Sequence, residues 1–335
     1  MSGPRRSRRG ASLVRALPRR ARRRVGRLGR RARVLPPRPA ILMYHRIADD
    51  DVDPWGLAVP ADRFEEQVTW LRRSRTVLPL AELARRHRRG DLPAGAVAIT
   101  FDDGYACNAT TAAPILTGLG VPATVFVTTG PVAAGREFWW DELQQVVATT
   151  EATRLEVATD ERRIVVELGP TPATPREAAY LELWRAVRAL APDAQAAALD
   201  DLRDQAGIPA GPRASHRPMT VDELQGLARS ELVDIGCHTM THPALTERSP
   251  ADQRAEVEGG LRRCEALIGR TPSSFAYPFG DHDAATVDVV RDAGFEVACT
   301  TQRAAVTAGH DVLALPRVQV GRWSATELAR TLRDL

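Results

Sequence analysis

The stretch VAITFDDGYACN, residues 97–108, contains the feature that decides the fold. An apolar run ends at Phe101, and two adjacent aspartates, Asp102 and Asp103, follow it directly before Gly104. One interpretation is a surface turn, because Asp-Gly pairs are common in turns. The other is a buried β-strand that presents carboxylates at its carboxyl end, where catalytic groups of α/β proteins lie. The rest of the chain has to decide between the two.

Strand-like and helix-like segments alternate on both sides of this stretch. Apolar strand-like runs occur at residues 40–47, 76–79, 96–101, 122–129, 232–239, 273–279, 295–301 and 314–320, with helical patterns between most of them. Such alternation is typical of parallel β-structure built from βα units. About seven strands favour closure into a barrel over an open sheet, although periodicity alone does not distinguish the two.

Residues 131–218 interrupt this alternation. Within them, residues 154–168 have the pattern of a β-hairpin that turns around residues 159–161, and residues 175–207 have a helical pattern. Long excursions of this kind are usually carried on surface loops. We therefore interpret residues 131–218 as an insertion subdomain on one loop of a barrel domain that spans residues 39–335.

Charge is distributed unevenly along the chain. Residues 1–38 contain 15 arginines and no acidic residue, so the remainder carries 31 basic and 42 acidic residues, a formal charge of −11. We interpret residues 1–38 as a disordered basic arm. It either makes weak contact with an anionic membrane surface, or is a solvated tail or an upstream start codon assigned in error. We expect no specific nucleic-acid partner.

Cysteine usage and hydropathy indicate the cellular compartment in which the protein works. Cys107, Cys237, Cys264 and Cys299 form no C-x-x-C pair, which is typical of free thiols in a reducing compartment. No apolar run reaches the ~18–20 residues that a membrane helix requires. The segment ASLVRALP at residues 11–18 is too short and too interrupted for a signal peptide. We expect a cytoplasmic protein, peripheral at the inner membrane face if the arm binds lipid.

A second cluster, HTMTH, places His238 and His242 four residues apart, directly after a predicted strand. The two histidines either bind a metal or are unrelated polar loop residues. Because the carboxyl ends of barrel strands converge on one face, Asp103 can meet both of them. Two histidines and one carboxylate leave open coordination positions, as in catalytic metal sites. Asp102 is then available as a general base for a water acidified by a divalent metal.

Three short motifs carry a resemblance to a known family. In order, TFDDG (100–104), HTMTH (238–242) and FAYPFG (275–280) resemble the first three motifs of the polysaccharide deacetylases, carbohydrate esterase family 4 with its NodB homology domain. The segments ILMYHRI and LPRVQV are similar to one branch of that family. The resemblance spans residues 40–322, broken by the insertion.

The resemblance implies a distorted (β/α) barrel of about seven strands. It also implies hydrolysis of N-acetyl groups, or O-acetyl groups in some relatives, on a saccharide or glycan precursor. By motif position it implies that Asp102 is the base and that Asp103, His238 and His242 hold one divalent metal, with Zn²⁺ the best candidate.

The third motif departs from the family pattern. The family commonly has R-x-P-Y where this chain has Ala276, Tyr277, Pro278 and Phe279, so the arginine that steers the base is missing. The resemblance assigns the oxyanion-hole role, shared with the metal, to the backbone N–H of Phe279, which needs no particular side chain. We expect Tyr277 and Pro278 to contact substrate beside it.

The last family motif, L-x-H, is also changed. Its nearest counterpart is Leu315-Pro316-Arg317, which lacks the histidine that supplies the general acid. We hypothesise that Arg317 tethers or polarises the base and that His45, at the end of the first predicted strand, donates the proton. The alternative is that His45 only hydrogen-bonds a strand end.

Trp140 lies in FWWDEL, residues 138–143, near the start of the insertion. An aromatic pair followed by acids forms either a sugar-stacking wall or part of a helix core. We include Trp140 among the predicted substrate contacts.

Three rival functions remain open at this point. Two histidines and a carboxylate also bind Fe(II) in oxygenases, but those sites use a close H-x-[D/E] pair on an all-β jelly roll. A non-catalytic carbohydrate-binding barrel would explain the changed motifs, yet every metal ligand and the base are kept. A metal-independent amidohydrolase of the same superfamily is disfavoured by the complete HTMTH motif. Metal content and acetate release discriminate among them.

Overall fold

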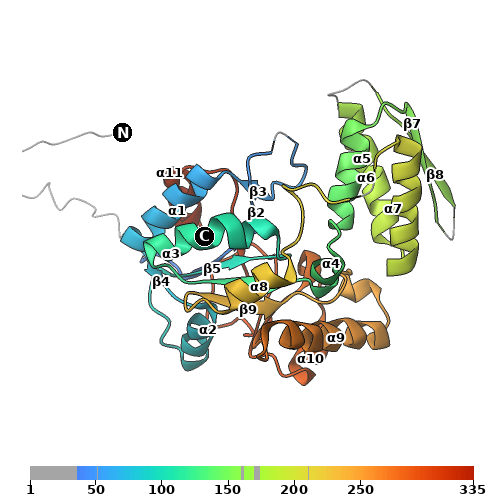
Figure 1. Cartoon of the computed structure of the whole chain (residues 1–335). Helices are drawn as coiled ribbons and strands as arrows, with labels where there is room; N and C mark the ends of the chain where they lie inside the picture. Colours follow the sequence, from blue (N-terminus) through green and yellow to red (C-terminus); the bar gives the residue numbers. More distant parts are fainter. Residues whose placement is uncertain (1–35, 51, 160–161, 170–173, 210) are drawn as a thin grey trace, which may run out of the picture. The chain divides into compact units, whose positions relative to one another are not determined.

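The computed structural model describes residues 36–335, apart from residues 51, 160–161, 170–173 and 210 (Figure 1). The basic arm predicted at residues 1–38 therefore lies outside the described residues, except for its last three. Residues 37–335 form one compact unit. Within the described residues, no helix combines the length and the apolar character needed to span a membrane.

A parallel sheet lies at the centre of this unit. Its strands run in the order β11-β10-β9-β6-β5-β1-β12, and every neighbouring pair is parallel. They are β1 (Ala40–Tyr44), β5 (Ala96–Phe101), β6 (Ala123–Val127), β9 (Val233–Cys237), β10 (Ser274–Ala276), β11 (Val297–Cys299) and β12 (Val318–Gln319), and the short β4 (Thr76–Val77) pairs with the start of β5. The predicted parallel β-structure of about seven strands is confirmed, and the all-β scaffold of the oxygenase alternative is not what this chain adopts.

One extended segment joins the two edges of the sheet. Leu315 forms a parallel bridge with Cys299 of β11, and three residues later Val318 pairs with Leu42 of β1. The sheet therefore curls back towards itself, as the resemblance to a distorted (β/α) barrel implied. Its carboxyl strand ends consequently meet at one face, where barrel active sites lie.

Helices follow most of the strands and pack against the sheet (Figure 1). They are α1 (Ala61–Ser74), α2 (Leu80–Arg89), α3 (Ala113–Leu119), α8 (Val221–Ala228), α9 (Pro250–Ile268), α10 (Ala284–Asp292) and α11 (Ala325–Arg333). Thr220 and Glu223 form the predicted capping box before α8. The helix expected at residues 108–120 begins instead as a π-helical turn, Asn108–Ala112, because Pro114 lacks the N–H that an uninterrupted α-helix needs there.

The predicted insertion follows β6 and consists of helices and one hairpin (Figure 1). Its elements are α4 (Thr129–Ala134), α5 (Trp139–Thr149), the antiparallel pair β7 (Arg154–Ala158) and β8 (Arg163–Glu167), α6 (Thr174–Arg188) and α7 (Pro192–Ala206). The elements from α5 to α7 share a hydrophobic cluster of their own, which also includes Tyr105 from the loop after β5, whereas Val132 of α4 packs in the core of the sheet. A second small parallel pair, β2 (Arg46–Ile47) and β3 (Ala58–Val59), flanks the loop of residues 48–57.

Candidate active site

Strand β5 ends at Phe101, and the turn after it sends two carboxylates in different directions. The backbone N–H of Asp102 still donates to Tyr44 O (2.9 Å), which continues the ladder with β1. Asp103 adopts a left-handed backbone with φ of 74° and reverses the chain. Both side chains are buried, and β5 is buried along its whole length. The interpretation as a buried strand end is therefore confirmed, and a surface turn is excluded.

Asp102 is held by Arg317 in a two-pronged ion pair. Arg317 Nη1 donates to Asp102 Oδ1 and Nη2 to Oδ2, both at 2.6 Å. Nε donates to Thr300 O (2.9 Å) and Nη1 also to Thr100 Oγ1 (3.1 Å), so the buried guanidinium is fixed on several sides. Burial is the largest single influence and opposes the charged carboxylate. The charge and hydrogen bonds of Arg317, together with His238 and His45, outweigh it and lower the pKa of Asp102 to about 2.

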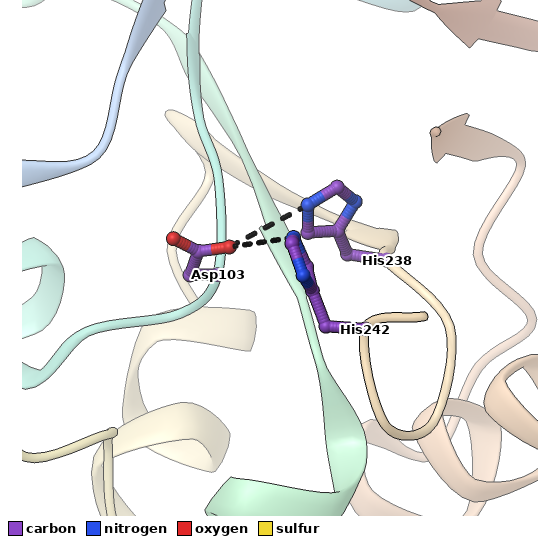
Figure 2. Close-up of side chains that lie close together, drawn as sticks. All are labelled: Asp103, His238 and His242. Carbon is purple, nitrogen blue, oxygen red and sulfur yellow. Dashed lines mark ion pairs between the residues drawn. The ribbon is translucent and has the colours of Figure 1, made fainter. Parts of the chain in front are cut away.

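Asp103 faces the two histidines of HTMTH (Figure 2). Its Oδ1 lies 3.5 Å from His238 Nε2 and 3.5 Å from His242 Nε2. The ligand atoms of the three buried residues lie within 4.8 Å of one another. The convergence predicted from strand ends far apart in the sequence is therefore observed.

The donor set fits a divalent transition metal. His238 Nδ1 donates to Ala276 O (2.8 Å), which leaves the lone pair of Nε2 free. Burial, with His238 nearby, lowers the pKa of His242 to about 3, so this imidazole is neutral. Asp103 Oδ1 is buried and has no hydrogen-bond partner among the described residues. Atoms bound at about 2.0–2.1 Å to a tetrahedral Zn²⁺ lie about 3.4 Å apart, close to the 3.5 Å that separates Asp103 Oδ1 from each imidazole.

Backbone strain is concentrated at this site. Among the described residues, four that are not glycine have positive φ: Asp103 (74°), Thr239 (66°), His242 (62°) and Phe279 (58°). A left-handed conformation costs such a residue about 1–2 kcal/mol. Strain of this kind is found at active sites and ligand clamps, where the surrounding structure enforces it.

The loop between the two histidines is held by Glu256 of α9, which the sequence interpretation missed. Its buried carboxylate accepts hydrogen bonds from Met240 N (3.0 Å), Thr241 N (3.0 Å) and Thr241 Oγ1 (2.7 Å). One turn later, a Cβ at Gly260 would lie 2.8 Å from the carbonyl carbon of Thr239. Helix α9 therefore approaches the loop too closely for any side chain at that position.

His45 lies beside the base. Its Nε2 is 4.0 Å from Asp102 Oδ2, and its backbone oxygen accepts from Asn108 Nδ2 (2.8 Å). The buried Nδ1 has no hydrogen-bond partner among the described residues. The imidazole therefore does not serve to cap a strand end in the described part of the chain, and it lines the same pocket as Asp102 and Asp103.

The residues of the third motif are divided between core and pocket. Phe279 lines the pocket, with its ring centroid 4.6 Å from that of His242. Tyr277 is fully buried, packs against Phe275, and donates from its hydroxyl to Leu313 O (2.8 Å). Pro278 is buried as well. Neither Tyr277 nor Pro278 is among the residues that line the pocket, so the expected substrate contact does not agree with their positions.

A pocket of about 250 Å³ opens onto the metal ligands and the base. The predicted Trp140 lines it, with its ring centroid 4.6 Å from that of His242 and its Nε1 donating to Tyr105 OH (3.0 Å). Six further lining residues were not predicted: Met43, Trp55, Leu57, Trp184, Thr301 and Gln319. The wall of the pocket is therefore largely aromatic and apolar around a polar floor.

A sequence model described as polysaccharide deacetylase matches residues 89–154 and 210–298. The chain belongs to the polysaccharide deacetylase family. It is thus a hydrolase that acts on carbon–nitrogen bonds other than peptide bonds. The first matched stretch contains the adjacent aspartates and the second contains both histidines, whereas residues 155–209, most of the insertion, lie outside the match.

Individual relatives of this deacetylase are distant in sequence. YxkH of Bacillus subtilis (strain 168), itself assigned as a polysaccharide deacetylase, is 20% identical over 287 residues, which are 85% of this chain and 72% of YxkH. Poly-beta-1,6-N-acetyl-D-glucosamine N-deacetylase of Escherichia coli (strain K12) is 34% identical over 84 residues, 24% of this chain and 12% of that protein.

Solved structures of deacetylases have the same fold. The Streptococcus pyogenes deacetylase PplD, in complex with acetate, superposes with a TM-score of 0.59 at 19% identity, over 89% of this chain and 99% of PplD. IcaB from Ammonifex degensii gives a TM-score of 0.56 at 18% identity, over 89% of this chain and 97% of IcaB. At these identities the likeness concerns the fold alone, and it agrees with the curled parallel sheet described above.

Proposed function

We propose that this deacetylase removes N-acetyl groups from a saccharide or glycan precursor with the help of one bound divalent metal. The observation that carries the proposal is the buried cluster of Asp103, His238 and His242 next to a second buried aspartate, Asp102, on the floor of one pocket. The names of the relatives support it: the E. coli protein is called an N-deacetylase of an N-acetylglucosamine polymer, and the PplD structure contains acetate, the acid that this reaction releases.

Zn²⁺ is the metal that we propose, with Asp103, His238 and His242 as its ligands. A zinc ion with three protein ligands polarises a carbonyl oxygen and lowers the pKa of water towards about 7. The protein's own part is to orient both imidazoles and to keep His242 neutral. Ala276 O fixes the tautomer of His238, and Glu256 fixes the loop that carries both histidines.

Asp102 is the proposed general base. Arg317, with His238 and His45, keeps the pKa of Asp102 at about 2, so the carboxylate stays ionised over the physiological range and can accept a proton from water. The paired contacts of Arg317 also fix the plane of the carboxylate, and each oxygen retains a lone pair for the incoming proton. Arg317 is in this view a positioning residue that takes over the steering role of the missing arginine.

Phe279 and His45 complete the proposed reaction. The oxygen of water adds to the acetyl carbon while the water proton passes to Asp102, and the backbone N–H of Phe279 stabilises the negative charge that develops on the carbonyl oxygen. The carbon–nitrogen bond then breaks, and His45 gives a proton to the nitrogen as it leaves. The products are acetate and the amine of the sugar.

The test combines metal analysis with acetate release from N-acetylated and O-acetylated saccharides. We expect about one zinc per chain, and we expect Asp102→Asn to keep the zinc while losing turnover. Zinc without acetate from any saccharide would favour a carbohydrate-binding barrel, and acetate release that survives metal removal would favour a metal-independent hydrolase. Loss of zinc from Asp102→Asn would mean that the two aspartates have exchanged roles.

A further inference from the structure

The pocket has an aromatic wall that neither the predicted motifs nor the family match explains. Trp55, in the loop between β2 and β3, has its ring centroid 4.9 Å from that of Trp184 on α6 of the insertion. Both side chains line the same pocket as Asp103. Both also lie outside the residues that match the family model.

The loop that carries Trp55 is held in place by polar contacts. Trp55 Nε1 donates to the hydroxyl of Tyr180, one turn before Trp184 on α6 (2.8 Å). Asp53 accepts from two backbone N–H groups further along the loop, at 2.9 and 2.7 Å. Gln319 donates to two backbone oxygens of the loop, including that of Trp55 (3.0 Å). A side chain fixed in this way loses little freedom when a ligand binds.

The wall nevertheless keeps aromatic surface in contact with water. Trp55 is 37% exposed, and Trp184 is half-buried. Trp184 meets Phe279 edge to face at 5.9 Å, and the guanidinium of Arg188 lies over both rings, at 5.5 and 4.9 Å. Aromatic surface that is rigid, partly exposed and next to a reactive centre gains free energy when an apolar ligand face covers it.

We propose that Trp55 and Trp184 stack against the pyranose ring that carries the acetyl group. This inference rests on the proposed function and names the part of the substrate that the wall contacts. The C–H groups on one face of a pyranose form an apolar surface that suits an aromatic ring, while the hydroxyls at its edge need polar partners. The pocket, at about 250 Å³, is small for a ligand site, so the acetyl group and one sugar ring fill it.

The experiment measures kcat and KM for acetate release from N-acetylated glucosamine oligosaccharides with the zinc-loaded enzyme. We expect Trp184→Leu and Trp55→Leu to raise KM about tenfold, equivalent to about 1.4 kcal/mol, with kcat changed by less than about threefold. Trp184→Phe, which keeps an aromatic face, restores most of the KM. Trp70→Leu on α1 removes a half-buried tryptophan that does not line this pocket, and we expect it to change neither constant.

Two results would overturn this inference while leaving the proposed function intact. The first is an unchanged KM in both leucine variants although the wild type releases acetate. The second is a fall in kcat as large as the fall in kcat/KM together with loss of zinc, which would mean that the wall only supports the metal ligands. A wild type that releases no acetate from any acetylated saccharide would instead overturn the proposed function, and this inference with it.

Discussion

Two buried aspartates, one at the end of a sheet strand and one in the insertion, have pKa values shifted in opposite directions. Asp102, at the end of β5, touches Arg317 directly, and this contact together with His238 and His45 outweighs burial and lowers the pKa of Asp102 to about 2. Asp141, on α5 of the insertion, accepts from the hydroxyl of Tyr105 (2.7 Å). Burial raises the pKa of Asp141 to about 7, although the charge of Arg46 opposes it. The two pKa values shift in opposite directions because a cation contacts one carboxylate in a paired geometry and not the other.

The comparison shows how the site is divided between the two regions. The strand ends of the sheet supply the ionisable groups: two carboxylates, three imidazoles and a guanidinium. The insertion supplies aromatic surface, with Trp140 and Trp184 on its helices. The first region carries the proposed chemistry, and the second shapes what reaches it.

The largest effect that would test this division is expected from Arg317→Met. Without the guanidinium, burial dominates and raises the pKa of Asp102, so the base becomes protonated nearer neutral pH. We expect turnover at pH 7 to fall by about 10²–10⁴-fold, the usual contribution of a general base. Because the folded-state pKa of Asp102 moves up, the acid limb of the kcat/KM profile moves to higher pH and activity partly recovers in alkaline buffer.

Arg317→Lys is the matched control, because it keeps the charge but lacks the paired geometry. We expect the acid limb of this variant to lie between those of the wild type and Arg317→Met. Removal of one partner from a buried pair also costs about 3–5 kcal/mol of stability, so both variants are compared below their unfolding transitions. A uniform loss of activity at all pH values, with no shift of the limb, would show that Arg317 supports the fold but does not set the base.

The charged part of the site could be predicted from sequence because each group follows a strand. Asp103 and His238 come just after apolar runs, His242 lies four residues beyond His238, and parallel strands bring their carboxyl ends to one face whatever the exact register. The tether of Asp102 by Arg317 was predicted for a different reason, the absence of the motif arginine and histidine. A buried carboxylate needs a cation, and Arg317 occupied the remaining motif position.

Side-chain direction after a strand could not be predicted in the same way. Tyr277 continues the alternation of β10 and points into the core beside Phe275. Two residues later, the left-handed backbone of Phe279 directs its own ring towards the pocket. A motif gives the position of these residues but not the turn between them. Substrate contact was therefore assigned to Tyr277 on position alone.

The aromatic wall and the loop clamp depend on packing between segments far apart in the chain. Trp184 lies among the apolar residues of an amphipathic helix, and nothing in its spacing distinguishes it from core. Trp55 reaches the site only because the insertion offers Tyr180 and Trp184 as partners. Glu256 was overlooked as one acid among several on α9, although its place beside Val257 and Gly260 on the buried face was a usable signal.

A smaller effect on the charged region is expected from Glu256→Gln. The carboxylate accepts three hydrogen bonds from the loop between the histidines, and an amide oxygen accepts them more weakly. We expect zinc affinity to fall by about 10–100-fold, as is usual when a group that orients metal ligands is changed. Competition with a chelator of known zinc affinity measures this.

The control for Glu256→Gln is Glu258→Gln on the same helix. Glu258 pairs with Arg254 and Arg262 on the more exposed side of α9 and does not contact the loop. We expect the zinc affinity of the Glu258→Gln variant to equal that of the wild type. Equal affinities for Glu256→Gln and the wild type would mean that the strained loop keeps its conformation without the clamp, and that the backbone alone orients the histidines.

The smallest effect is expected in the insertion, from Asp141→Asn, and it concerns stability. The pKa of Asp141 is about 7 in the folded protein and near 4 when unfolded, so the folded state holds a proton that the unfolded chain releases between these values. Stability therefore falls as the pH rises from 4 to 7, and the asparagine variant, which cannot ionise, escapes this loss. Denaturant unfolding measures the free energy of unfolding of Asp141→Asn minus that of the wild type. We expect this difference to be about 1–3 kcal/mol more favourable to the variant at pH 8 than at pH 5. The same difference at both pH values would mean that Arg46 neutralises Asp141 as Arg317 neutralises Asp102, and the contrast between the two regions would be lost.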